Sequence, residues 1–246
     1  ETDTEGNCAF GDGFFKGLFP NNNGRDFFKL EGEALEAWKN KYGDKIVDFG
    51  AGKLNNTRTL RNAGVFVSAF EPYFVTTGDT IHKEKSIEIA NKFLDEVESG
   101  VEYTSVFISS VFNSVPFMED RIKIAQIAAA LCSPGGRVVC WCQSNESQQF
   151  VITKKHSVTN NARLTFDLDY EPNTVLGDIS KHPKVQKGHT ADELKDIFSR
   201  SFKSIDRIDM ISKFWYLEAT KPTVNPERLA EALDFEFNLP YPDGTT

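Results

Sequence analysis

The sequence has few cysteines, no metal-ligand spacing among them, and no long hydrophobic run. Its four cysteines are expected to be reduced thiols, which favours a cytoplasmic, intracellular protein without a metal site. No apolar stretch approaches the length needed to cross a membrane, and no signal peptide is visible. The chain begins at Glu1 rather than Met, which indicates trimming or a piece of a longer protein.

Positive charge is also scarce. With 36 acidic and 28 basic residues, the formal net charge is −8, which argues against undirected binding to nucleic acid or to an anionic membrane. The composition is otherwise ordinary for a globular protein. A length of 246 residues predicts one large domain, or a domain with an insertion, around a substantial core.

Two short apolar runs each end in a carboxylate. The first, K-I-V-D-F-G-A-G, contains Asp48, Gly50 and Gly52, and a polar segment that suits a helix follows it. A strand, a glycine turn and a helix start bring backbone N–H groups close to a ligand. The second, F-V-S-A-F-E-P-Y, ends at Glu71, at about the spacing where such a unit presents an acid to a ribose. The sequence therefore predicts a nucleoside-containing cofactor.

A nicotinamide dinucleotide is the less favoured cofactor. Its G-x-G-x-x-G/A pattern is broken here by Asn55, whose side chain would crowd the close packing of helix on strand. Asp48 inside the turn would repel a pyrophosphate. No tyrosine is followed four residues later by lysine, the pair that short-chain dehydrogenases need. An NAD-type oxidoreductase stays open only as an alternative.

The pattern D-x-G-x-G with a later E-P resembles the class I S-adenosylmethionine-dependent methyltransferases. The turn L-x-S-P-G-G at 131–136 and the segment T-x-x-E-L at 190–194, in which Thr190 and Glu193 form an expected capping box, resemble the same family. The resemblance covers roughly residues 45–220, with an insert set aside. It implies S-adenosylmethionine as the cofactor, with contacts from Asp48, Gly50, Gly52, Lys53, Glu71, Pro72, Tyr73 and Ser109.

The resemblance also implies an α/β fold: a Rossmann-like, doubly wound, mostly parallel sheet with an antiparallel closing strand, and an insertion after strand five. Helices are expected at 32–42, with Trp38 inward, and at 84–98, with a stripe that includes Ile87, Phe93 and Leu94. A further helix is expected at 119–132, and 204–211 and 213–222 should form the closing pair. The family's third strand has no secure candidate, and Asp79 is the only nominee for its acid.

Four segments are expected. Residues 1–43 form an aromatic-rich arm followed by a helix, and the arm either packs on the domain or closes over the cofactor as a lid. Residues 44–142 and 189–221 form the core. Residues 143–188 form an insert with strands at 149–153 and 162–168, and residues 222–246 form a helix and tail. From Val151 to His189 there are six basic and four acidic residues. This local excess favours either a solvated insert or recognition of an anionic acceptor, such as nucleic acid or a phosphorylated metabolite.

The loop Ser109–Pro116 follows a buried strand and should meet the methyl acceptor, because ligands bind at the carboxyl ends of strands in open α/β sheets. Asn113, Ser110 and His189 are the candidate catalytic residues, although His189 also suits a structural role beside a helix cap. The loop lacks the signatures of amino-methylating nucleic-acid enzymes and of cap-type ribose methyltransferases. The fragments E-P-Y, V-F-N-S-V-P and K-V-Q-K-G-H-T resemble, faintly, methyltransferase-like proteins of bacterial or phage DNA-modification systems.

The predicted function is transfer of a methyl group from S-adenosylmethionine to an unidentified acceptor, a small molecule or nucleic acid, by direct displacement. The leaving group is neutral, so the protein mainly has to align acceptor, methyl and sulfur, and no metal is needed. A non-catalytic scaffold or partner subunit with the same fold is the alternative. Aminocarboxypropyl transfer would use the same cofactor site.

Overall fold

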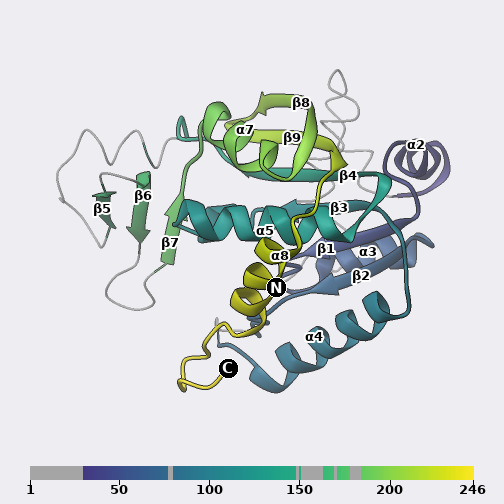
Figure 1. The fold of residues 1–246 in the computed structure, drawn as a ribbon, viewed down its shortest axis with the longest axis horizontal. Helices are drawn as coiled ribbons and strands as arrows, with labels where there is room; N and C mark the ends of the chain where they lie inside the picture. The colour runs from purple at the N-terminus through teal and green to yellow at the C-terminus, as the bar shows by residue number, and fades with distance from the viewer. Residues whose placement is uncertain (1–29, 77–79, 148–149, 151–162, 169–170, 178–183) are drawn as a thin grey trace.

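The computed structural model describes residues 30–76, 80–147, 150, 163–168, 171–177 and 184–246 (Figure 1). Its centre is a six-stranded sheet in the order β2-β1-β3-β4-β9-β8. The first four of these strands in space run parallel, and β9 runs antiparallel to both β4 and β8. The strands are β1 (Lys45–Phe49), β2 (Phe66–Phe70), β3 (Tyr103–Ser109), β4 (Cys132–Gln143), β8 (Phe202–Ile211) and β9 (Phe214–Pro222).

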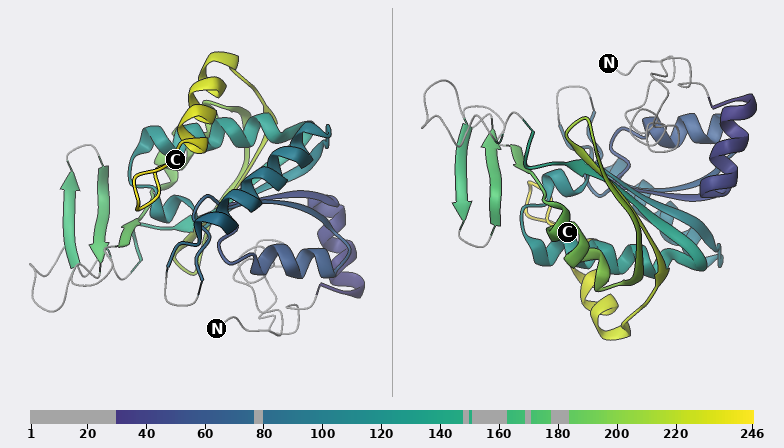
Figure 2. Two further views of the ribbon diagram at one scale, coloured as in Figure 1. Left: turned by 90° about the horizontal axis from the view of Figure 1, so that it is seen from below. Right: turned by 90° about the horizontal axis from the view of Figure 1, so that it is seen from above.

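Helices cover both faces of this sheet (Figure 2). Alternation along the strands divides the core in two: Val106 and Ile108 pack with the helices of one face, whereas Phe107 packs against Trp38 on the other. The helices of the first face are α4 (Lys83–Glu98), α5 (Met118–Leu131), α7 (Ala191–Ser199) and α8 (Pro226–Phe237), and those of the second are α2 (Gly32–Tyr42) and α3 (Asn55–Asn62). The predicted doubly wound α/β fold with an antiparallel closing strand is confirmed.

The expected third strand is not among the described residues, and β2 forms the edge of the sheet there. Val75 and Ile81 make only an isolated antiparallel bridge, and Asp79 lies outside the described residues. Helix α4 therefore leads from β2 directly to β3. Part of its predicted apolar stripe is wrong: Ile87 and Leu94 are 41% and 37% exposed, because no strand or helix of the described chain covers that side.

A second, three-stranded antiparallel sheet lies apart from the main one, at the left of Figure 1. It consists of β5 (Arg163–Leu168), β6 (Glu171–Gly177) and β7 (Lys184–Lys187), in that order. The strand expected at 162–168 is confirmed. Most of the strand expected at 149–153, and all of the arm at 1–29, lie outside the described residues.

Helix α8 packs along α5, and the tail after it returns to the end of β2. Phe237 lies 5.1 Å from Phe70, centroid to centroid, and the Tyr73 hydroxyl donates to the carbonyl of Pro240 at 3.0 Å. The C-terminal segment thus lies beside the carboxyl end of β2. The described thiols of Cys132, Cys140 and Cys142 are buried and unpaired. None of the described helices is long and apolar enough to cross a bilayer.

Candidate functional site

A cavity of about 580 Å³ opens at the carboxyl ends of β1, β2 and β3. This volume lies within the range of small-molecule sites, and the position is the one where open α/β sheets bind ligands. Three parts of the chain contribute: the ends of the three strands, the loop before α5, and helix α8. The lining residues are Phe49, Gly50, Gly52, Glu71, Pro72, Tyr73, Ser109, Ser110, Val111, Ser114, Val115, Pro116, Ile124, Phe235, Glu236 and Leu239.

The turn after β1 requires glycine for two different reasons. Gly50 has a φ of 73°, and a Cβ there would overlap Cγ2 of Val111, so the turn and the β3 loop approach each other as only glycine permits. Gly52 has a φ of 53° with open space where a Cβ would stand. The N–H groups of Gly50 and Ala51 donate to the carbonyl of Phe70 at 2.8 and 2.9 Å. The turn is therefore fastened to β2.

Glu71 holds the other side of this turn. Its carboxylate accepts hydrogen bonds from the N–H groups of Gly52, at 2.6 Å, and Tyr73, at 2.9 Å. Burial raises the pKa of Glu71, and the two backbone donors partly offset the rise. These bonds fix the orientation of a buried acid that lines the cavity.

Two predicted cofactor contacts lie outside the cavity lining. Asp48 is buried, and the Thr57 hydroxyl of α3 donates to it at 2.6 Å. Burial raises the pKa of Asp48 to about 6, against the effect of the Thr57 hydrogen bond. Lys53 is exposed, and its carbonyl accepts from Arg58. In this structure Asp48 joins β1 to α3 rather than facing the cavity.

The end of β3 carries a strained residue. Ser110 is exposed with a φ of 62°, the left-handed region that non-glycine residues rarely adopt, and its N–H donates to the carbonyl of Trp141 at 2.6 Å. Such strain is often found at ligand sites. Ser109 and Ser110 both line the cavity, close to the glycine turn as expected.

Asn113 and His189, the other two candidate catalytic residues, lie outside the lining. The Asn113 Oδ1 accepts from the N–H of Gln143 at 2.7 Å, and the His189 N–H donates to the Gln143 carbonyl at 2.9 Å. The His189 Nδ1 lies 3.1 Å from the same carbonyl. Both side chains are buried and brace the end of β4. The expected capping box of Thr190 and Glu193 at the start of α7 is confirmed.

Helix α8 supplies a carboxylate that the sequence analysis missed. Glu236 is 5% exposed and lines the cavity, and its Oε2 has no hydrogen-bond partner among the described residues. Burial, and then the charges of Glu71 and Asp120, raise the pKa of Glu236 to about 7. One signal was available: Glu236 follows buried Ala232 by one helical turn, so it is an acid within an apolar stripe.

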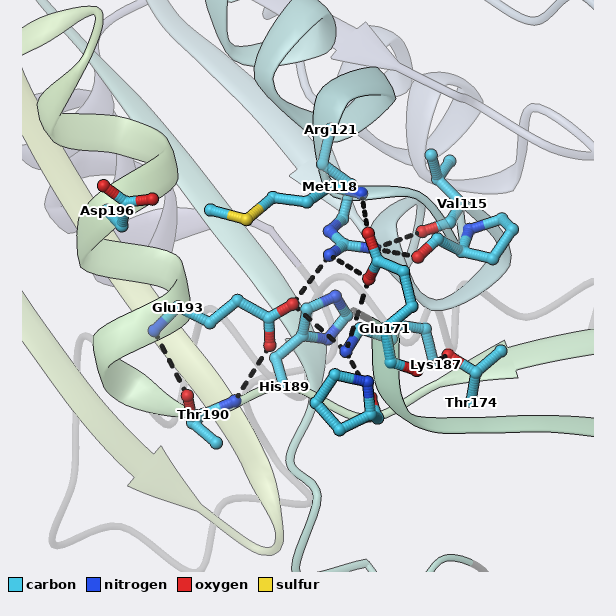
Figure 3. A network of polar contacts seen from close by, with 12 residues as sticks. Val115, Met118, Arg121, Glu171, Thr174, Lys187, His189, Thr190, Glu193 and Asp196 are labelled. Carbon is cyan, nitrogen blue, oxygen red and sulfur yellow. Dashed lines mark hydrogen bonds and ion pairs between the residues drawn. The ribbon is translucent and has the colours of Figure 1, made fainter. Parts of the chain in front are cut away.

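A buried ionic cluster supports the rim of the cavity (Figure 3). Arg121 of α5 donates to the carbonyls of Val115 and Pro116, both at 2.7 Å, and both of these residues line the cavity. The same guanidinium binds Glu171 of β6 at 3.1 Å and Glu193 of α7 at 2.6 Å. One side chain thus connects the cavity rim, the second sheet and α7.

Lys187 completes this cluster. Its ammonium lies 3.1 Å from Glu193, and it donates to the carbonyl of Pro172 at 2.6 Å. Burial lowers the pKa of Lys187, and Glu193 and Glu171 oppose that effect. The side chain is 0% exposed. Lys187, one of the six basic residues counted in this segment, therefore pairs with two acids inside the protein rather than facing the solvent.

The charges around the cavity have one sign. Glu71 and Glu236 line it, whereas none of the described residues in its lining is a lysine, arginine or histidine. In the part of the chain that the structure describes, no group of three His, Cys, Asp or Glu side chains is arranged to hold a metal ion. The cavity thus combines two carboxylates, several hydroxyls and apolar walls, which suits a ligand that is cationic or rich in hydrogen-bond donors.

The fold is found in solved structures, although at low sequence identity. The PH0226 protein from Pyrococcus horikoshii OT3 superimposes with a TM-score of 0.51 at 15% identity, over 85% of this chain and 99% of its own. An S-adenosylmethionine-dependent methyltransferase from Methanosarcina mazei gives a TM-score of 0.51 at 14% identity, over 73% of this chain and 93% of its own. No protein-family model matches the sequence, and no curated protein matches it either. The chain has the class I methyltransferase fold.

Proposed function

We propose that the protein is an S-adenosylmethionine-dependent methyltransferase that moves a methyl group to its acceptor by direct displacement. The observation that carries this proposal is the acidic cavity at the ends of β1, β2 and β3, with Glu71 fixed between the glycine turn and Tyr73. The Methanosarcina mazei neighbour, which shares the fold, is named as an enzyme of this kind.

The charges favour S-adenosylmethionine over a dinucleotide. S-adenosylmethionine carries a net positive charge and no phosphate, so an acidic cavity tolerates it, whereas a pyrophosphate would meet Glu71 and Glu236 without a basic side chain among the described lining residues to neutralise it. Within the glycine turn, the N–H groups of Gly50 and Ala51 already donate to Phe70 and that of Gly52 to Glu71, so none of these three is left for a pyrophosphate. The oxidoreductase alternative therefore loses support.

Roles follow from these positions. Gly50, Gly52 and Glu71 are proposed to hold the methionine and ribose parts, and Pro72 and Tyr73 the base. Ser109 and Ser110 are proposed to meet the transferring methyl group and the acceptor, since they end β3 at the cavity. Asp48, Lys53, Asn113 and His189 are proposed to support the site from outside its lining. Catalysis then rests mainly on alignment.

The acceptor is proposed to be a small molecule or nucleic acid recognised in part by residues 143–188. A chain of contacts supports this proposal, because Arg121 and Glu171 connect the second sheet to Val115 and Pro116, which line the cavity. The anchoring of β6 at the rim through Glu171 supports a role of this segment in acceptor binding.

Calorimetric titration with S-adenosylmethionine and S-adenosylhomocysteine tests the cofactor assignment. We expect micromolar binding by the wild type, and at least about 10-fold weaker binding by Glu71→Ala, because a buried charged hydrogen-bond acceptor is lost. Glu231→Ala removes an exposed acid of α8 and serves as the matched control with unchanged affinity.

Absence of binding by a folded wild type would contradict the enzyme assignment and favour a scaffold with this fold. Equal affinities of the wild type and Glu71→Ala would contradict the assigned role of Glu71. Once binding is measured, incubation with DNA, RNA and phosphorylated metabolites in the presence of methyl-labelled cofactor identifies the acceptor class.

A further inference from the structure

The most unusual side chain of the cavity is Glu236. It is 5% exposed, and its Oε2 is a buried acceptor without a hydrogen-bond partner among the described residues. Burying an unpartnered carboxylate is costly, and such groups in native proteins usually await a ligand, a water or an ion. The side chain lines the same cavity as Glu71, so a ligand of that cavity is the available partner.

No described cation neutralises Glu236. The charged groups that face it are the acids Glu71 and Asp120, and both raise its pKa. The nearby ammonium of Lys123 binds Asp120 at 3.1 Å and lies over the ring of Phe235, 4.0 Å from its centroid. A hydrogen-bond donor on the ligand is therefore the partner that the cavity offers to Glu236.

The walls around Glu236 suit a flat ring. Phe235 and Leu239 of the C-terminal segment and Pro72 and Tyr73 after β2 line the cavity with it. A planar apolar heterocycle packs well on proline and aromatic surfaces. A donor in the plane of such a ring can reach a carboxylate at the edge of the walls.

The segment that carries Glu236 is fastened in place. Asp243 pairs with Lys83 of α4 at 3.2 Å, and the Tyr241 ring lies 6.0 Å from the Tyr73 ring, centroid to centroid. Lys83 also lies over the Tyr241 ring, 5.2 Å from its centroid. Helix α8 and the tail therefore form a fixed wall of the cavity.

We propose that Glu236 binds the nucleoside part of the cofactor, and that its carboxylate accepts a hydrogen bond from the exocyclic amino group of the adenine base. This inference rests on the proposed function. Glu71 would serve the ribose and Glu236 the base, so two acids far apart in the sequence hold one cofactor. The C-terminal helix is then part of the cofactor site and sets its specificity for the base.

The test compares S-adenosylhomocysteine with S-inosylhomocysteine, in which an oxo group replaces the amino donor. We expect the wild type and Glu231→Ala to prefer S-adenosylhomocysteine by at least about 10-fold in calorimetric titrations at pH 8, where Glu236 is mostly ionised and can only accept, because a buried acceptor is otherwise left unpaired. In Glu236→Ala the preference should fall to about 2-fold or less. In Glu236→Gln the amide can accept from the amino group or donate to the oxo group, so the preference for S-adenosylhomocysteine should fall clearly below that of the wild type.

Circular dichroism and thermal unfolding establish that each variant is folded; the isosteric Glu236→Gln keeps the test decisive if Glu236→Ala is unstable. If the folded wild type binds S-adenosylhomocysteine and the Glu236 variants keep the wild-type preference, the inference is overturned while the proposed function stands. If the wild type binds neither compound, both are overturned.

Discussion

At the scale of single residues, buried acids dominate the behaviour of the site. Glu236 and Asp48 have pKa values raised to about 7 and about 6, mainly by burial. A raised pKa means that the folded state holds the proton more tightly than the unfolded state does. Each group therefore costs stability when it is ionised, and that cost disappears as the pH falls.

Replacing Glu236 by glutamine is expected to raise the free energy of unfolding by about 1–3 kcal/mol at pH 8, because the variant carries no buried charge facing Glu71 and Asp120. The gain should shrink as the pH falls through about 7, and it should vanish near the ordinary value of 4.5. Urea unfolding at pH 8, 6.5 and 5 measures it, with Glu231→Gln as the exposed control. A gain that is independent of pH would contradict the assignment to a titrating carboxylate.

The two glycines of the turn are expected to respond differently to alanine. Gly50→Ala forces a Cβ into Val111 as well as straining the backbone, whereas Gly52→Ala only strains the backbone. We expect a loss of about 1–2 kcal/mol for Gly52→Ala and clearly more for Gly50→Ala. Thermal unfolding compares them. Equal losses would mean that the approach of Val111 does not limit the turn.

At the scale of elements, the second sheet is fastened to the core through charge rather than through apolar packing alone. Arg121 and Lys187 are fully buried, and they share Glu171 and Glu193. Because the same arginine binds the carbonyls of Val115 and Pro116, a change in the cluster should reach the rim of the cavity.

Replacing Arg121 by methionine is expected to lower the free energy of unfolding by about 3–5 kcal/mol, because it leaves the buried Glu171 and the partly buried Glu193 with one ammonium. Chemical denaturation measures the loss. Lys195→Met removes an exposed pair with Asp192 on α7 and should cost less than about 1 kcal/mol. Similar losses in the two variants would indicate that the cluster contributes no more than a surface pair.

At the scale of the whole molecule, the cavity is built from parts that are distant in the sequence: the ends of three strands, the loop before α5, and α8. A ligand that binds only the folded state stabilises it by mass action. S-adenosylhomocysteine at about 100 times its dissociation constant should therefore raise the free energy of unfolding by about 2.7 kcal/mol. A thermal shift assay measures this, and no shift in the wild type would contradict binding at this cavity.

The sequence by itself determined the local features. The glycine turn, the carboxylate at the end of β2, the capping box of Thr190 and the closing antiparallel pair were all predicted, because each depends on neighbouring residues or on strand and helix periodicity. Ser109 and Ser110 were also placed at the cavity, since the carboxyl ends of parallel strands share one edge.

Only the tertiary structure decided which side chains meet. It buried Lys187 in an ionic cluster, turned Asn113 and His189 toward the backbone of Gln143, and brought Glu236 to the cavity that Glu71 lines. Periodicity reports which face of an element is apolar, but not which distant element will cover it. The ionic state and the partner of each polar side chain depend on which distant element packs over it. They therefore follow from tertiary packing rather than from local sequence.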